Sequence, residues 1–203
     1  VAAGRMDCAD DAEVVATLAR VRQVIRLTRH HLHHESQHVH PALEARRRGA
    51  AGAAAREHTE HEAAFERLEA RAAEVERTAG EAREAASLAL YRELALFAAE
   101  DFRHMHDEET ALNAALWSHF SDEELKAIHH AIVSAVAPDL MAEYLRWLVP
   151  AMTPAERAGF LSEMRQAAPA EAFGGALQLA KSVLDGRAWA KLVAALGSRP
   201  LAV

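Results

Sequence analysis

The sequence predicts an all-α protein. Of its 203 residues, 51% are apolar and 26% are charged, a balance typical of a folded chain rather than a disordered one. Much of the apolar share is alanine, a strong helix former, whereas six prolines and nine glycines are few for the length. Apolar residues recur at helical spacing, and no run shows the β-branched alternation of a sheet.

The first predicted helix runs from about residue 10 to residue 40. Pro41 has no amide hydrogen, so we expect it to bend or end this helix. Residues 46–52 then read as a loop. The apolar positions that define the helix are Val14, Val15, Leu18, Val21, Ile25, Leu32, Val39 and Leu43.

Two further long helices are expected, at about residues 53–78 and 83–119. Gly80 is a suitable stop for the first of them, because glycine readily ends helices. The apolar markers are Phe65, Leu68 and Val75 in the first, and Leu90, Leu94, Phe97, Met105, Leu112 and Leu116 in the second.

After His119 the pattern changes to shorter helices. Ser121 with Glu124, and Thr153 with Glu156, have the spacing of capping boxes at helix starts. Prolines separate segments of about 12–16 residues. We therefore expect a bundle domain over residues 1–120 and a C-terminal annex of shorter helices over residues 121–203.

Composition and charge limit where in the cell the protein is expected and which classes of partner it can bind. The net charge is -7, and no basic stripe is present that would neutralise the phosphates of a nucleic acid. No apolar stretch is long enough for a membrane span or a signal peptide. Cys8 is the only cysteine, which excludes an internal disulfide and a thiolate metal site. These features predict a soluble, cytoplasmic protein with neither a nucleic-acid nor a membrane partner.

One motif occurs twice. Residues 31–35 and residues 104–108 both read His-x-His-x-Glu, and apolar positions line up around the two copies at the same offset. Positions i and i+4 share one face of a helix, so His31 lies beside Glu35, and His104 beside Glu108. Two helices therefore offer equivalent polar faces to one another.

These faces suit a metal ion. A histidine and a carboxylate from each of two helices provide neutral nitrogen donors together with oxygens that can bridge two ions, as iron or manganese requires. His58, with His61 and Glu62 one turn on, offers a third source of ligands. A surface ion pair would explain either His–Glu pair alone, but two copies in matching apolar context favour the metal interpretation. A charged helix face explains His61 and Glu62 equally well.

Over about residues 10–120 the chain resembles the hemerythrin-like (HHE) family. In that family, one helix bears His-x-x-x-Glu with a proline six residues past the glutamate, and a later helix bears His-x-x-x-Glu-Glu. The helix between them opens with an acidic residue followed by histidine and then apolar positions. The matching residues are His31, Glu35 and Pro41; His104, Glu108 and Glu109; and Glu57, His58, Phe65 and Leu68.

The resemblance implies an up-down helical bundle that holds two iron ions, with manganese or a mixed Fe/Mn pair as alternatives. Carried over by position, the terminal ligands would be His31, His58 and His104. Glu35 and Glu108 would then bridge the two ions.

The chain departs from the family in two respects. The family takes another histidine from a preceding helix, whereas no histidine occurs before His30 and only three long helices are predicted. We expect the first bundle helix upstream of Val1, or the annex or a second chain of a homo-oligomer in its place. The residue four after His58 is Glu62 rather than histidine, and as an extra carboxylate ligand it would favour redox chemistry.

Three functions remain open. The first is a di-iron protein that binds or senses a small ligand, namely O2, NO or peroxide. The second is an enzyme, a di-iron oxidase or oxygenase acting on a small organic substrate, with peroxidase-like activity included. The third is a helical interaction module whose metal is structural or lost.

Overall fold

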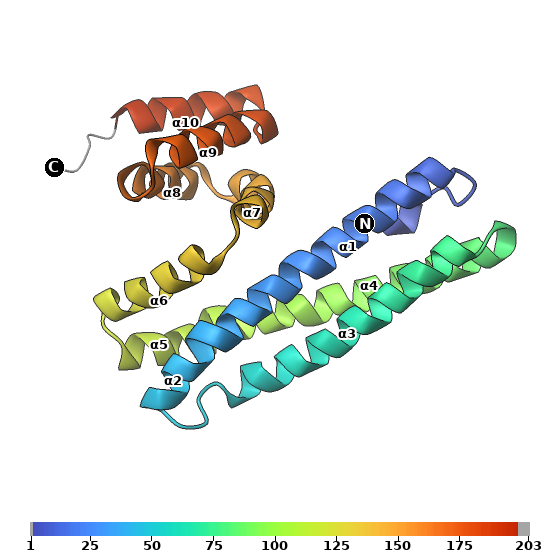
Figure 1. Cartoon of the computed structure of the whole chain (residues 1–203), viewed down its shortest axis with the longest axis horizontal. Helices are drawn as coiled ribbons and strands as arrows, with labels where there is room; N and C mark the ends of the chain where they lie inside the picture. Colours follow the sequence, from blue (N-terminus) through green and yellow to red (C-terminus); the bar gives the residue numbers. More distant parts are fainter. Residues whose placement is uncertain (1, 199–203) are drawn as a thin grey trace. The chain divides into compact units, whose positions relative to one another are not determined.

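The computed structural model describes residues 2–198, and within this range every regular element is helical, with no strand. The all-α prediction is confirmed. The chain divides into two compact units, one ending at Ala135 and the other starting at Val136 (Figure 1). We call them the N-terminal and C-terminal units and describe each by itself.

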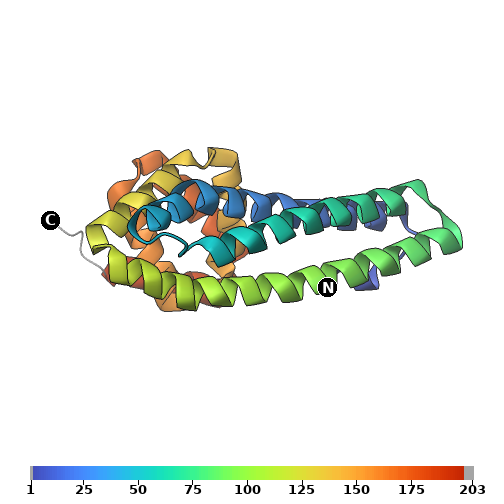
Figure 2. The same cartoon turned by 90° about the horizontal axis from the view of Figure 1, so that it is seen from below.

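Three long helices form the N-terminal unit: α1 (Asp11–His34), α3 (Gly52–Arg77) and α4 (Gly80–Asp107). They run side by side, and α3 packs against both α1 and α4 (Figures 1 and 2). A short 3-10 helix, η1 (Ala2–Arg5), packs against α1 and α4. The three predicted long helices and the loop near residues 46–52 are confirmed within a few residues.

Local signals set the helix ends. The Asp10 carboxylate accepts hydrogen bonds from the amides of Ala12 and Glu13, which caps the first turn of α1. α3 ends at Arg77, and the chain turns through Gly80, whose φ of +56° is readily adopted only by glycine.

The core of the N-terminal unit follows the predicted apolar faces. Leu18, Phe65, Leu68 and Leu90 are fully buried. Burial of such side chains stabilises the fold by about 1.5–3 kcal/mol each. The buried residues of this core are Met6, Val14, Leu18, Val21, Ile25, Leu32, Ala64, Phe65, Leu68, Ala72, Val75, Ala86, Leu90 and Phe97.

Two π-helical turns interrupt the long helices. The turn η2 (Glu35–Val39) joins α1 to α2 (His40–Arg46), and η3 (Glu108–Leu112) joins α4 to α5 (Asn113–His119). Pro41 was predicted to bend or end the first helix, and it does not end it, because helical structure continues to Arg46 with Pro41 in the first turn of α2. The preceding π-turn displaces the carbonyl that a proline ring would otherwise strike.

The helix α6 (Asp122–Ala135) completes the N-terminal unit, and it begins at the first predicted capping box. The Glu124 amide donates to Ser121 Oγ at 3.3 Å, and the Ser121 amide donates to Glu124 Oε2 at 2.9 Å. The division into compact units thus places residues 122–135 with the bundle, whereas the sequence-based division at residue 120 groups them with the annex.

The C-terminal unit contains α7 (Pro138–Ala151), α8 (Pro154–Ala167), α9 (Ala170–Val183) and α10 (Gly186–Ser198). The second predicted capping box, Thr153 with Glu156, is present at the start of α8. The unit has its own core, formed by Leu145, Val149, Ala158, Leu161, Ala176, Ala180, Leu192 and Leu196. Among the described residues, no helix is both long and apolar enough to cross a membrane.

Candidate metal centre

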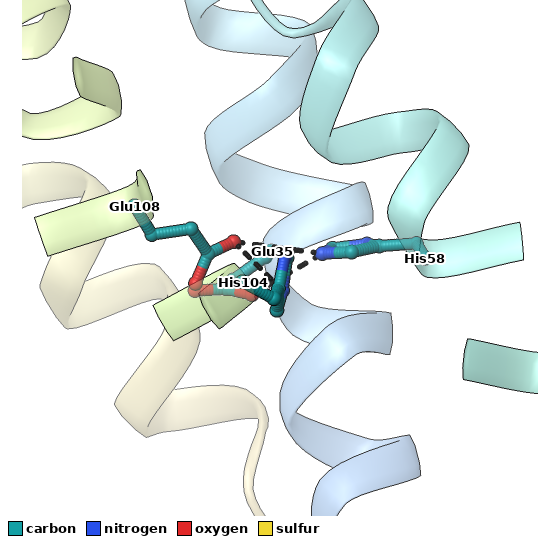
Figure 3. Close-up of side chains that lie close together, drawn as sticks. All are labelled: Glu35, His58, His104 and Glu108. Carbon is teal, nitrogen blue, oxygen red and sulfur yellow. Dashed lines mark ion pairs between the residues drawn. The ribbon is translucent and has the colours of Figure 1, made fainter. Parts of the chain in front are cut away.

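Four polar side chains converge inside the N-terminal unit. Glu35 at the start of η2, His58 on α3, His104 on α4 and Glu108 at the start of η3 each offer one ligand atom, and these atoms lie within 4.8 Å of one another (Figure 3). We call these residues the His/Glu cluster. Three of them are buried, and Glu35 is half-buried.

The two copies of the repeated motif meet at this cluster. His31 Nε2 lies 3.4 Å from Glu35 Oε1, and His104 Nε2 lies 3.2 Å from Glu108 Oε1. His58 Nε2 lies between the copies, 3.6 Å from Glu35 Oε2 and 3.6 Å from Glu108 Oε1. The two helices thus present their His-x-x-x-Glu faces to a common interior point.

Each copy of the motif runs into a π-turn, since Glu35 opens η2 and Glu108 opens η3. A π-turn closes after five residues, and the amide of His40 donates to the carbonyl of Glu35. His40 therefore returns to the same side of the helix as Glu35. Its ring centroid lies 4.6 Å from that of His58, and its side chain is buried.

The histidines are held by their Nδ1 atoms. His61 Nδ1 donates to the carbonyl oxygen of Glu57 at 2.8 Å, and His104 Nδ1 lies 2.8 Å from Glu57 Oε2. His58 Nδ1 lies 2.9 Å from Ser36 Oγ. A carbonyl oxygen and a carboxylate only accept, so Nδ1 of His61 and of His104 carries the proton and their Nε2 atoms keep a lone pair. This is how proteins orient a histidine that binds a metal through Nε2.

The opposite ring atoms are buried and unsatisfied. Within the described part of the chain, Nε2 of His31, His58 and His104 makes no hydrogen bond, and the same holds for Glu35 Oε2 and Glu108 Oε1. A buried polar atom without a partner costs about 1–3 kcal/mol. Such atoms, gathered at one point, fit a cation that would accept their lone pairs.

Burial and mutual repulsion shape the charge of the cluster. Burial, followed by the nearby Glu108, raises the pKa of Glu35 to about 8. Burial also acts to raise the pKa of Glu108, but the nearby His58, His104 and His31 outweigh it and lower that pKa overall. Burial lowers the pKa of His31, which favours the neutral ring that a metal requires.

A second pair lies beside the cluster. His61 Nε2 lies 3.6 Å from Asp101 Oδ1, and the His61 ring centroid lies 4.9 Å from that of His104. His61 is only 5% exposed, and its Nε2 has no hydrogen-bond partner within residues 2–198. Burial raises the pKa of Asp101, although the neighbouring His61, His104 and His31 act to lower it.

The seven residues expected as ligands lie at different distances from a common point in the structure. Glu35, His58, His104 and Glu108 form the cluster, His31 contacts it through Glu35, and His61 lies next to His104. Glu62 is not brought to this group. Its carboxylate pairs with Arg29 Nε at 3.0 Å, and half of its side chain is exposed.

Four residues that contact the histidines of this region were not among the expected ligands: Ser36, His40, Glu57 and Asp101. A sequence signal existed for Asp101, which precedes His104 by three residues and so shares its face of α4. No such signal marks Ser36, because it acts on a ring carried by a different helix. Glu57 belongs to the motif that resembles the family, but its contact with His104 joins α3 to α4 and so depends on how these helices pack.

The donor set fits a hard or borderline metal ion. It combines imidazole nitrogens with carboxylate oxygens, and the only cysteine, Cys8, lies outside the described helices. The His/Glu cluster can therefore hold a metal. A scan against protein-family models and searches of the curated proteins and the solved structures find no match to this chain.

Proposed function

We propose that the N-terminal unit is a hemerythrin-like bundle that holds a dinuclear non-haem iron centre and binds or senses O2, NO or peroxide. The observation that carries the proposal is the His/Glu cluster itself, with ligand atoms that lie within 4.8 Å of one another and lack hydrogen bonds inside the described region. The order and spacing of its residues along the chain are those that resemble the family.

Both carboxylates contact histidines of this group. The two oxygens of Glu35 face different histidines, since Oε1 lies near His31 and Oε2 near His58. Glu108 Oε1 lies near both His58 and His104. In the roles that the resemblance implies, Glu35 and Glu108 would be the shared carboxylate ligands, and His31, His58 and His104 would be the terminal ligands.

Iron at such a centre would supply an open coordination position and accessible redox states for a small ligand. The protein contributes a dry, rigid surround. Phe65 and Phe97 pack edge to face with ring centroids 5.4 Å apart, and the Phe97 ring lies 5.5 Å from His61. These two rings form an apolar floor that packs against His61, whose ring in turn contacts that of His104.

Metal analysis and the absorption spectrum of protein purified in air test the proposal. We expect two irons per chain, with near-ultraviolet and visible bands that shift on addition of azide or peroxide. The His58→Ala variant should lose the bands, whereas His130→Ala, an exposed histidine on α6, should keep them. A folded wild-type protein that takes up neither iron nor manganese would contradict the proposal and leave the metal-free interaction module.

One observation favours the enzyme alternative, a di-iron oxidase or oxygenase. Asp101 adds a carboxylate beside the cluster to those of Glu35, Glu108 and Glu57, and carboxylate-rich donor sets stabilise higher oxidation states of iron. Consumption of O2 in the presence of an electron donor, above that of the His58→Ala variant, would support this alternative over reversible binding.

A further inference from the structure

We infer that Asp101 and His61 are the terminal ligands of a second cation position, adjacent to the His/Glu cluster. The inference rests on the proposed function and assigns one of its two ions to residues outside the cluster. Asp101 was not anticipated from the sequence and has no counterpart in the residues that carry the family resemblance.

The first argument is that Asp101 and His61 stand apart from the His/Glu cluster. The ligand atoms of the four cluster residues lie within 4.8 Å of one another, and Asp101 and His61 are not members of that group. They form a pair of their own, 3.6 Å apart, and the pair adjoins the cluster through the His104 ring. A single ion at the cluster would have no contact with Asp101 and His61. With two neighbouring ions, the cluster would bind one and this pair would bind the other.

The second argument is the orientation of the His61 ring, which leaves its Nε2 free to bind a cation. Its Nδ1 donates to the Glu57 carbonyl, so its Nε2 has a lone pair directed toward Asp101. That nitrogen is buried and makes no hydrogen bond within the described residues. A direct hydrogen bond to Asp101 would need a shorter contact than 3.6 Å. A cation between the two groups would satisfy both.

The third argument is charge. Asp101 lies three residues before His104 on α4, and its side chain is 27% exposed. Its electrostatic neighbours are His61, His104 and His31, together with the carboxylate of Glu108. Two divalent ions carry four positive charges, which Glu35 and Glu108 alone would offset by half. A third carboxylate at the second position brings the centre closer to neutrality, as buried charges require.

Asp101 lies on α4 one turn before His104, so this one helix would supply donors to both cation positions.

The test is an anaerobic titration of the metal-free protein with Fe2+, with iron counted after desalting. The variant is Asp101→Asn, which keeps the size of the side chain and removes its charge. The matched control is Glu100→Gln, an exposed carboxylate next to it on α4. Changes beyond the direct ligands commonly cost 10–100-fold in metal affinity, so loss of a ligand should weaken the second equivalent by at least about 100-fold.

We expect two equivalents in the wild type and the Glu100→Gln control, and one tight equivalent in Asp101→Asn. Two tight equivalents in Asp101→Asn would overturn the inference while leaving the proposed di-iron centre intact. No uptake by the wild type would instead refute the proposed function. If Asp101→Asn fails to fold by circular dichroism, His61→Gln tests the same position, and two tight equivalents there would likewise overturn it.

Discussion

Glu57 links two histidines through different atoms. Its carboxylate holds His104 Nδ1, and its backbone carbonyl holds His61 Nδ1. The carboxylate contact is therefore the one that a side-chain substitution can remove. It orients a fully buried ring whose Nε2 faces Glu108.

We predict that Glu57→Gln weakens iron binding by about 10–100-fold without unfolding the bundle, because a neutral amide replaces the charge-assisted hydrogen bond that orients His104. Titration with Fe2+ measures the change, and Glu60→Gln, an exposed glutamate on the same helix, is the control. Equal affinity in Glu57→Gln and the wild type would show that the contact does not position a ligand.

The raised pKa of Glu35 predicts a pH dependence for the metal-free protein. The native carboxyl has a pKa of about 8, against an ordinary value near 4.5, so between these values the folded state binds a proton that the unfolded state lacks. The free energy of unfolding should therefore fall as pH rises from about 4.5 to 8, by a few kcal/mol at most, and then level off.

Urea unfolding of chelator-treated protein at several pH values measures this effect. Comparison with Glu35→Gln isolates it, because the amide does not titrate, and the variant should be the more stable protein at pH 8. A difference between the two proteins that stays constant from pH 4.5 to 8 would contradict the assignment of the raised pKa.

Some of the residues that converge in the N-terminal unit could be predicted from sequence, because their pairing is local. His31 with Glu35 and His104 with Glu108 share a helix face whatever the tertiary structure does. Residues 61 and 62 both lie within about 60° of the direction of His58 around the helix, so spacing alone could not separate them. In the structure Glu62 points toward Arg29 on α1 instead of the cluster, and this contact depends on how α1 packs against α3.

At the scale of elements, the π-turns are the feature that sequence did not reveal. Nothing in residues 35–39 or 108–112 marks an extra residue per turn, because a π-turn has weak intrinsic preferences and is retained where packing or function requires it. Here both turns begin with a glutamate of the His/Glu cluster. η2 also turns His40 toward His58 and brings the fully buried Leu43 into position.

Deletion of Gln37 tests the role of η2. Gln37 is exposed, and its removal should convert the five-residue turn to a four-residue α-helical one. Five residues of a π-turn and four of an α-helix complete about the same rotation, so His40 and Leu43 should keep their present faces. We therefore expect the deletion variant and Gln37→Ala to have nearly the wild-type free energy of unfolding. A loss of about 2–5 kcal/mol in the deletion variant, as for removal of a large core side chain, would refute this account.

The apolar floor beneath the centre offers a second test at this scale. Phe65 is fully buried, so Phe65→Ala should destabilise the protein by about 3–5 kcal/mol in urea unfolding. Phe102 on α4 is 76% exposed, and Phe102→Ala should have little effect. Equal effects of the two substitutions would mean that the core is not where the structure places it.

For the whole molecule, the all-helical class and the presence of a C-terminal set of short helices followed from composition, periodicity and the two capping boxes. The position at which the N-terminal unit ends did not follow from the sequence. Helix α6 begins with a capping box like the annex helices, but it packs against η2 of the bundle, and no local sequence feature encodes which neighbour a helix chooses.

The two separate cores predict separable effects of substitution. Leu161 is fully buried in the core of the C-terminal unit, so Leu161→Ala should lower the stability of that unit by about 2–5 kcal/mol. The donors of the centre all lie in the N-terminal unit, so iron content should stay at the wild-type value. Loss of iron in folded Leu161→Ala would show that the two units are coupled.

The most direct test of the central claim is a crystal structure of the iron-loaded protein with anomalous diffraction recorded at the iron absorption edge. We predict two anomalous peaks inside the N-terminal unit, within bonding distance of Glu35, His58, His104 and Glu108, with Asp101 and His61 at the second peak. Anomalous peaks elsewhere on the molecule, or none in protein that was supplied with iron, would contradict the account.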